Sequence, residues 1–175
     1  AGGIPVLLTN GKTLDDKVKA ALSSLGIQQV IVLGGTDRVS DALVDSLSDA
    51  GITSTKRIAE SDRFQTAAAI YAWAFAAVNP SGTETNRGLG WTTTAAHKVA
   101  YIANGASGFA DALAVGPLAG AYKNPILTTA GDKLVDAATK VLKDNKAQFT
   151  DGVWALGQQD RVSAVVIATA EAAIK

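Results

Sequence analysis

The chain has no cysteine, no methionine and only one histidine, His97. The absence of cysteine excludes disulfides, a thiolate nucleophile and cysteine-built zinc sites, and it fits an extracytoplasmic protein. A triad or a metal site would have to be assembled around His97 alone, so we expect no metal and a solvated loop histidine. Because methionine is missing even at position 1, we expect a processed or excised piece of a longer product.

Net charge and long apolar runs are also missing. Sixteen basic residues balance sixteen acidic ones, so no overall field would draw the protein to nucleic acid or to an anionic membrane surface. No run approaches the roughly 20 apolar residues of a membrane helix, and the start AGGIPVLL lacks a signal-peptide pattern. We therefore expect neither nucleic acid nor membrane as a partner, and any attraction to an anion must be local.

Short apolar runs alternate with helical patterns along most of the chain. Strands are predicted at 4–9, 29–33, 52–58, 98–103, 125–129 and 152–156. Helices are predicted from Thr13 to Gly26, from Ser40 to Gly51, from Ser61 to about Val78, and at 109–121, 134–144 and 163–174. The segment 79–97 lacks periodicity and predicts a long loop or hairpin. This alternation is typical of an α/β fold with a mainly parallel sheet and helices on both faces.

An internal repeat organises the sequence. LGGTDRVS (33–40) returns as LGQQDRVS (156–163) with six of eight positions identical, and 5–22 matches 125–142 at seven of eighteen positions. We therefore expect residues 1–56 to be the latter part of one repeat and 57–175 to be one complete repeat. A half-repeat leaves sheet edge and apolar surface uncovered, so the first part should pack on the second or on a neighbouring chain.

Three segments carry a family resemblance. They are VIVLGGTDRVSDALVDSL with its second copy VWALGQQDRVSAVV, RIAESDRFQTAAAI, and ANGASGFADALAVGPLAGAYKNPILTT. Together they resemble the cell wall binding repeat 2 family, which occurs in tandem on surface proteins of Gram-positive bacteria. The sequence departs from the family pattern at four positions, namely Glu60, Phe64, Thr128 and Gln158. At Gln158, the second copy has either lost a ligand contact or tolerates a different turn.

The resemblance implies a non-catalytic module of Rossmann-like or Toprim-like architecture without a cofactor. Such a module would hold a secreted protein non-covalently on the cell wall, through an anionic polysaccharide or a teichoic-acid-like polymer. Repeats of this kind often act in threes, so sibling repeats or a homo-oligomer are also expected partners.

Two polar sites invite either a structural or a functional interpretation. GASG (105–108) follows a strand and opens a helix, so Ser107 either caps a tight turn or belongs to a polymer-binding site. Its spacing fits neither a dinucleotide, P-loop nor nucleophile-elbow motif. Asp111 has no second acid, serine or histidine tied to it by spacing, so a capping role is predicted in place of a general base.

Arginine next to aspartate recurs at predicted helix starts. Asp62 is predicted to clamp strand and helix ends, whereas Arg57 and Arg63 are candidates for contact with an anion. In the repeated motif, Arg38 and Arg161 are the candidates for a ligand role. The remaining motif positions are predicted to be turn or cap residues: Gly34, Gly35, Ser40 and Ser163.

The three tryptophans are predicted to differ in role. Trp73 and Trp154 lie in a predicted helix and strand, positions typical of a core or an interface. Trp91 lies in a polar loop, where it is either a platform for sugar stacking or a packing contact.

Three functions remain in order of preference. The first is the wall-anchoring module, in which several weak contacts add up to retention through avidity. The second is a repeat-assembly or surface-display module without direct polymer binding. An α/β enzyme ranks last, because glycoside hydrolysis needs paired carboxylates and no such pair stands out by spacing.

Overall fold

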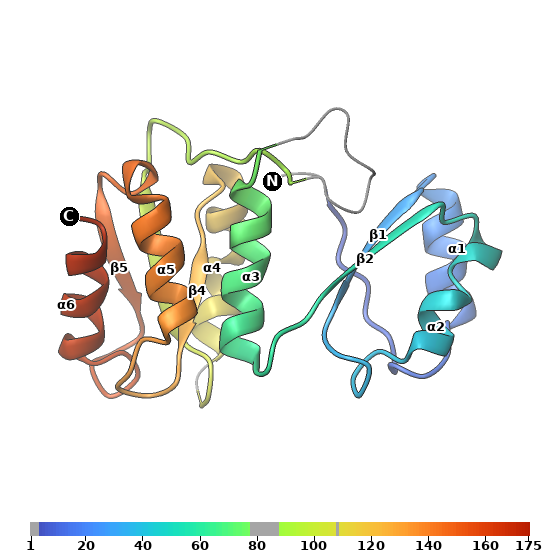
Figure 1. The fold of residues 1–175 in the computed structure, drawn as a ribbon, viewed down its shortest axis with the longest axis horizontal. Helices are drawn as coiled ribbons and strands as arrows, with labels where there is room; N and C mark the ends of the chain where they lie inside the picture. The colour runs from blue at the N-terminus through green and yellow to red at the C-terminus, as the bar shows by residue number, and fades with distance from the viewer. Residues whose placement is uncertain (1–3, 78–87, 108) are drawn as a thin grey trace.

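A computed structural model describes residues 4–77, 88–107 and 109–175 and confirms the predicted α/β class. The strands are β1 (Gln29–Leu33), β2 (Ser54–Ile58), β3 (Val99–Asn104), β4 (Ile126–Thr129) and β5 (Gly152–Leu156). The α-helices are α1 (Asp16–Ser24), α2 (Asp41–Asp45), α3 (Arg63–Phe75), α4 (Phe109–Tyr122), α5 (Asp136–Asp144) and α6 (Ala164–Ala173). Figure 1 shows two lobes, the first containing α1 to β2 and the second α3 to α6.

The first lobe has a parallel pair of strands covered by its helices. β1 and β2 run in register from Gln29 opposite Ser54 to Leu33 opposite Ile58. Apolar side chains from α1, β1 and the segment after α2 form its core: Leu22, Val32, Leu47 and Ile52. The predicted boundary between residues 56 and 57 falls inside β2.

The second lobe is a three-layer sandwich. Its parallel sheet has the order β4-β3-β5, and every residue of the central strand β3 is buried. Because side chains alternate along a strand, Ala100 and Ile102 face α3, α5 and α6, whereas Val99 and Tyr101 face α4. Helices therefore cover both faces of this sheet, as continuous apolar strands demand.

Of the predicted helix starts, those at Ser40 and Ser163 are confirmed, the helix predicted from Ser61 is capped one residue later by Asp62, and the start at Thr13 is wrong. The Oγ atoms of Ser40 and Ser163 and a carboxylate oxygen of Asp62 accept backbone N–H bonds at the starts of α2, α6 and α3. The start predicted at Thr13 is wrong, because Asp15 caps α1 by accepting from the amide of Lys17. Thr13 instead belongs to a preceding turn in which its amide donates to Asn10.

The repeat is visible in the elements themselves, with one exception. α1 and α5 each have nine residues and start 120 positions apart, since one begins at Asp16 and the other at Asp136. The counterpart of β4 was predicted at 4–9, and this prediction is wrong, because residues 4–10 have no regular secondary structure. β4 is held by hydrogen bonds to β3, and no described strand lies beside 4–9. Consequently Val6 and Leu8 are 80% and 86% exposed.

None of the helices within the described ranges has the length and apolarity needed to cross a membrane.

Candidate functional site

The polar loops of the second lobe meet at the carboxyl ends of its strands, called here the carboxyl edge. Because β3, β4 and β5 are parallel, the turns that follow them share this edge, and so do the starts of α4, α5 and α6. GASG follows β3, and the second closing turn (156–163) follows β5. This is the place where open α/β sheets bind ligands, so the geometry of the edge decides which side chains are available.

Asn104, which the sequence analysis did not single out, joins the two turns. It is 3% exposed at the end of β3. Its Oδ1 accepts from the amides of Ala106 and Ser107 at 2.8 and 2.9 Å, and its Nδ2 donates to the carbonyl oxygen of Arg161 at 2.9 Å. A buried amide with donor and acceptor both satisfied fixes its surroundings, so Asn104 sets the position of Ala106 and Ser107 relative to the second closing turn.

Arg161 and Ser107, both predicted ligand residues, lie in direct contact. Nη1 of Arg161 donates to the carbonyl oxygen of Ser107 at 3.0 Å and to its Oγ at 3.3 Å. Nε of Arg161 also lies 3.6 Å from a carboxylate oxygen of Asp160. The guanidinium of Arg161 is therefore already engaged in bracing the edge.

Asp111 lies in the first turn of α4, against the second closing turn. Gly157 has a φ of 98°, and a Cβ placed on it would come within 2.7 Å of Oδ2 of Asp111. The absence of a side chain at Gly157 thus lets the carboxylate approach the turn. The contact makes Asp111 part of the joint between α4 and β5, and its role as a cap stays a prediction.

In the first lobe, Arg57 braces the first closing turn (33–40). Nη1 of Arg57 donates to the carbonyl oxygen of Gly34 at 2.8 Å, and Nη2 lies 3.0 Å from Oδ1 of Asp41. Gly34 has a φ of 117°, a conformation that favours glycine. The amide of Ser40 donates to the carbonyl oxygen of Gly11, so this turn is also held from the N-terminal side.

Arg38 and Arg63 are the two predicted anion-binding arginines with exposed side chains and few partners. Arg38 meets only the equally exposed Asp37, at 3.3 Å, and its side chain is 78% exposed. Arg63 is exposed at the first position of α3, and within the described residues it has no hydrogen bond or ion pair. Arg63 keeps its side-chain donors for a ligand and Arg38 keeps its Nη groups, whereas Nη groups of Arg57 and Arg161 are engaged within the fold.

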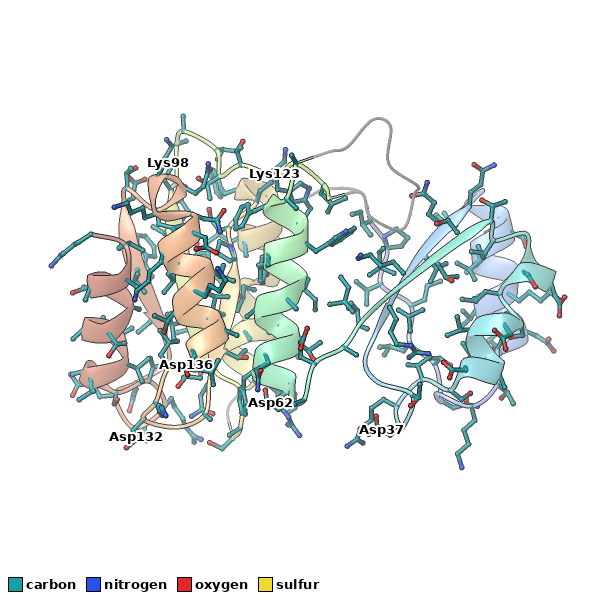
Figure 2. The ribbon with its side chains drawn as sticks, in the orientation of Figure 1. Asp37, Asp62, Lys98, Lys123, Asp132 and Asp136 are labelled. Carbon is teal, nitrogen blue, oxygen red and sulfur yellow. The ribbon has the colours of Figure 1, made fainter. Side chains whose placement is uncertain are left out.

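Carboxylates lie at the same end of the second lobe as the exposed Arg63. Figure 2 shows Asp62, Asp132 and Asp136 at one end of the second lobe and Lys98 and Lys123 at the other. The pKa of Asp62 is lowered, chiefly because its carboxylate accepts from the amide and then from the side chain of Gln65. Asp62 is thus committed to capping α3, in agreement with its predicted structural role. The neighbouring acids restrict attraction of an anion to the exposed guanidinium groups.

The structure places Trp91 away from this edge. Its amide donates to the carbonyl oxygen of Ala74, near the last turn of α3, whereas Arg63 is at the first turn. Trp154 was predicted to be a core or an interface residue, and its 49% exposure excludes the core, because β5 pairs only with β3 among the described strands. The first part of the loop predicted at 79–97, from residue 79 to residue 87, is outside the described residues.

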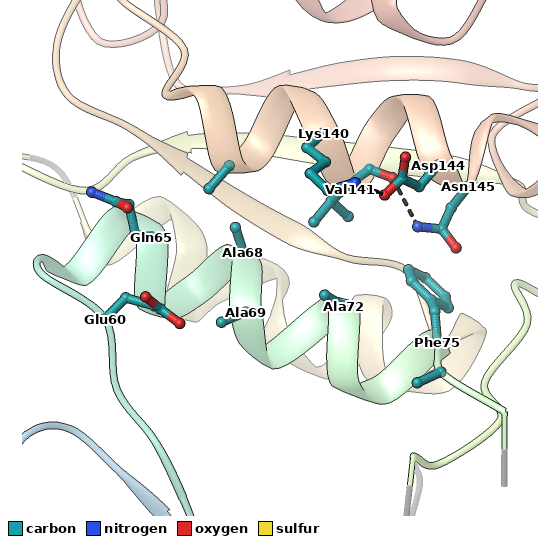
Figure 3. A pocket seen from close by; sticks show the side chains of 12 residues that line it. Glu60, Gln65, Ala68, Ala69, Ala72, Phe75, Lys140, Val141, Asp144 and Asn145 are labelled. Atoms are coloured by element: carbon teal, nitrogen blue, oxygen red, sulfur yellow. Dashed lines mark hydrogen bonds and ion pairs between the residues drawn. The ribbon is translucent and has the colours of Figure 1, made fainter. Parts of the chain in front are cut away.

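A surface groove of about 450 Å³ lies between α3 and α5. Figure 3 shows its α3 wall lined by Ala68, Ala69 and Ala72. On the α5 wall, Nζ of Lys140 is 2.6 Å from Oδ2 of Asp144, so the one cation lining the groove is already paired. This apolar groove offers little to an anionic ligand, and we do not assign the site to it.

Within the described parts of the chain, no three histidine or acidic side chains group as a metal site would require.

A family model matches most of the chain. Residues 57–167 match the family described as cell wall binding domain 2, abbreviated CWB2. The matched range contains GASG, Asn104, the second closing turn and the start of α6, so it includes the carboxyl edge of the second lobe.

Individual relatives agree with the family match. The N-acetylmuramoyl-L-alanine amidase LytC of Bacillus subtilis (strain 168) is 33% identical over 153 residues, which are 87% of this chain and 26% of that protein. The structure of Cwp6 from Clostridium difficile matches with a TM-score of 0.73 and 26% identity over 94% of this chain and 23% of its own. Cwp8 from the same organism matches in fold, with a TM-score of 0.64 and 24% identity over 90% and 23% of the two chains. The chain thus spans about a quarter of the length of each relative.

Proposed function

Because this chain belongs to the cell wall binding domain 2 family, we propose that it anchors a secreted surface protein by binding anionic polymers of the cell wall without a covalent bond. Family membership itself establishes association with the cell wall. The nature of the polymer, a polysaccharide or a teichoic-acid-like chain, and the contacting residues belong to the proposal. Binding alone accounts for the matched region, and no catalytic step is proposed for it.

The observation that supports polymer binding most directly is the pair of exposed arginines. Arg38 lies in the first closing turn and Arg63 begins α3, and their unpaired guanidinium N–H groups can form bidentate contacts with phosphate or carboxylate groups. Arg63 also lies at the first position of the 13-residue helix α3, where the helix dipole favours an anion. Contacts of single exposed charges are weak, and sibling repeats would supply retention by avidity.

Sedimentation with purified cell walls tests the proposal. The intact chain should pellet with walls and remain in solution once the anionic polymers have been removed selectively. Raising the salt concentration should release it progressively, because contacts between exposed charges are screened. Equal pelleting with treated and untreated walls would contradict the proposal.

A second function, assembly between repeats or copies, is supported by apolar side chains on two helices of the second lobe. Phe109 and Leu113 on α4 and Val165 on α6 are 66%, 70% and 68% exposed. Surfaces of this kind favour packing against another protein. Light scattering over a range of concentrations separates the two functions, since a monomer at high concentration argues against assembly.

A further inference from the structure

Four aromatic rings gather beside β5, at a distance from the exposed arginines. The imidazole of His97 lies 4.9 Å from the indole of Trp154, with the ring planes at 84°, and 5.0 Å from the ring of Tyr122. Nε2 of His97 is 2.7 Å from the hydroxyl oxygen of Tyr101, which is directly opposite Trp154 in the sheet. We call these four residues the aromatic cluster.

The members of the aromatic cluster differ in exposure, and Trp154 is the most exposed of them. Tyr101 is 1% exposed beneath α4, whereas Trp154 is 49% exposed because β5 has no described strand on its other side. The rings of His97 and Tyr101 approach the indole at angles of 84° and 81°, so the indole is held from its side by perpendicular rings. An exposed tryptophan that is fixed in this way loses little conformational entropy when it binds a ligand, because its orientation is already determined.

Buried polar groups hold Tyr101 in place beneath this surface. Asn124 is 1% exposed, and its side-chain amide lies beside the phenol of Tyr101. Burial raises the pKa of Tyr101, and a hydrogen bond with the Asn124 side chain partly offsets this rise. The amide of Thr94 donates to the carbonyl oxygen of Tyr122, so the backbone near His97 is also fixed. The side chains beneath Trp154 are therefore held in one arrangement.

Positive charge flanks the aromatic cluster in sequence and in space. Lys98 follows His97, and Lys123 follows Tyr122, and Figure 2 shows both lysines at the same end of the second lobe. Oδ2 of Asp151 accepts from the backbone amide of Lys98 at 2.8 Å. Lys123 has a φ of 58°, a conformation that L-residues rarely adopt.

We propose that Trp154 is a stacking platform for one sugar ring of a wall glycan, with a polar contact from the half-buried His97. The C–H face of a pyranose ring packs on the negative face of an indole, and its hydroxyl groups need donors and acceptors at the ring's edge. Lys98 and Lys123 supply charge for an acidic or phosphorylated substituent. This inference rests on the proposed wall anchoring only for the source of the sugar.

The test follows the three indole N–H signals of the intact, ¹⁵N-labelled chain by NMR. N-acetylglucosamine and its 1-phosphate are the two probes, and the Trp154→Phe variant assigns the Trp154 signal. Only the Trp154 signal should shift to saturation, with dissociation constants on the order of millimolar for a single sugar. The phosphorylated sugar should bind several-fold more tightly, and the preference should decline in the Lys98→Ala and Lys123→Ala variants because its electrostatic part is lost.

Trp91 provides the matched control, because it is the tryptophan that the sequence favours as a platform. Trp154→Ala should weaken binding of N-acetylglucosamine at least tenfold, Trp91→Ala should leave it unchanged, and Trp154→Tyr should restore part of it. A saturable shift of the Trp91 signal, or no saturable shift for either probe, would overturn the platform. So would an oligomer that Trp154→Ala converts to a monomer, because the surface would then be covered by a second copy.

Wall sedimentation of the same variants separates this inference from the proposed function. If the intact chain pellets with walls while the Trp154 signal shifts with neither probe, the platform proposal is wrong and the anchoring proposal stands. If the Trp154 signal responds but the chain does not pellet, the platform stands and anchoring is wrong.

Discussion

In the first closing turn, the amides of Arg38 and Val39 donate to the carbonyl oxygen of Gly35. The second closing turn repeats this pattern, with Arg161 and its successor donating to the carbonyl oxygen of Gln158. The backbone therefore accommodates Gln158 without a change of turn. This excludes the alternative that the second copy has a different turn at this position. What differs is the surroundings of the arginine, since side chains respond to neighbours that the repeated motif does not contain.

The neighbours of the two turns come from different parts of the fold. The second turn meets β3 and GASG, where Arg161 donates to Ser107 and Asn104 donates to Arg161. The first turn has no described strand in the corresponding place, and it is held by Arg57 and by backbone contact with Gly11. One sequence motif thus carries a bracing arginine in one lobe and a free arginine in the other.

Of the substitutions that test the difference between the two turns, replacement of Asn104 should change the free energy of unfolding most. Asn104→Ala removes three hydrogen bonds that join the turns and should lower the free energy of unfolding by about 2 kcal/mol. Urea unfolding followed by tryptophan fluorescence measures the change. All three tryptophans lie at or beyond residue 73, so the signal reports the second lobe. An unchanged midpoint would show that the two turns do not depend on Asn104.

Replacement of Arg161 and replacement of Arg38 should differ in their cost to the free energy of unfolding. Arg161→Ala should cost about 1 kcal/mol, because its bonds to Ser107 are lost. Arg38→Ala should change stability by less than about 0.5 kcal/mol, since an exposed ion pair contributes little. Urea unfolding by circular dichroism covers both lobes. Equal losses in the two variants would remove the distinction between a bracing and a free arginine.

The capping serines should behave alike. Ser40→Ala and Ser163→Ala each remove an N-cap acceptor and should each cost about 1 kcal/mol. Replacement by aspartate, which keeps an acceptor, should recover most of the loss. Thermal unfolding of the four variants tests this expectation, and a large cost at only one serine would show that the turns differ in backbone as well as in neighbours.

Exchange of residues at Gly35 and Gln158, one of the two divergent motif positions, should have little effect on stability. Gly35→Gln places a Cβ within 2.8 Å of the Asp37 side chain, which is exposed and able to move. We therefore expect Gly35→Gln and Gln158→Gly each to alter stability by less than about 1 kcal/mol, near the cost of glycine's extra freedom. Loss of wall binding in Gly35→Gln without loss of stability would instead reveal a ligand contact at this position.

The smallest effect concerns pH and the charged cap Asp62. Its folded-state pKa is lowered by the hydrogen bonds from Gln65. The ionised cap therefore stabilises α3 above the unfolded-state pKa, near 3.8, and this contribution is lost as pH falls through the folded-state pKa. Asp62→Asn should reduce the acid sensitivity of unfolding, whereas the serine variants should leave it unchanged. An identical pH profile for Asp62→Asn and the original chain would contradict this.

Local signals made much of the fold predictable. Apolar runs, the caps Ser40 and Ser163, and the repeat placed most helices and strands, because each signal acts within a few residues. The segment 4–9 has the apolar pattern of β4 and fails to form a strand, since strand formation also needs a neighbour to pair with. Pairing between strands distant in sequence is not visible in such patterns.

The candidate site was harder to predict for the same reason. Arg57 is bound to Gly34 and Asp41, which are 23 and 16 positions away, so its engagement depends on the pairing of β1 with β2. Trp154 is half-exposed only because β5 lies at the edge of the sheet, and strand order could not be derived from the sequence. Asn104 carried no motif at all, although a polar residue that ends an apolar strand is a usable signal.

Binding to wall polymer as a function of salt tests the account most directly. Arg38→Ala and Arg63→Ala should each weaken binding and flatten its dependence on salt concentration, with no change in unfolding. In contrast, Arg57→Ala should lower stability while the folded protein keeps its salt dependence. If Arg38→Ala and Arg63→Ala bind isolated anionic wall polymer as the original chain does, with the same salt dependence, then the exposed arginines do not hold the polymer and the account is wrong.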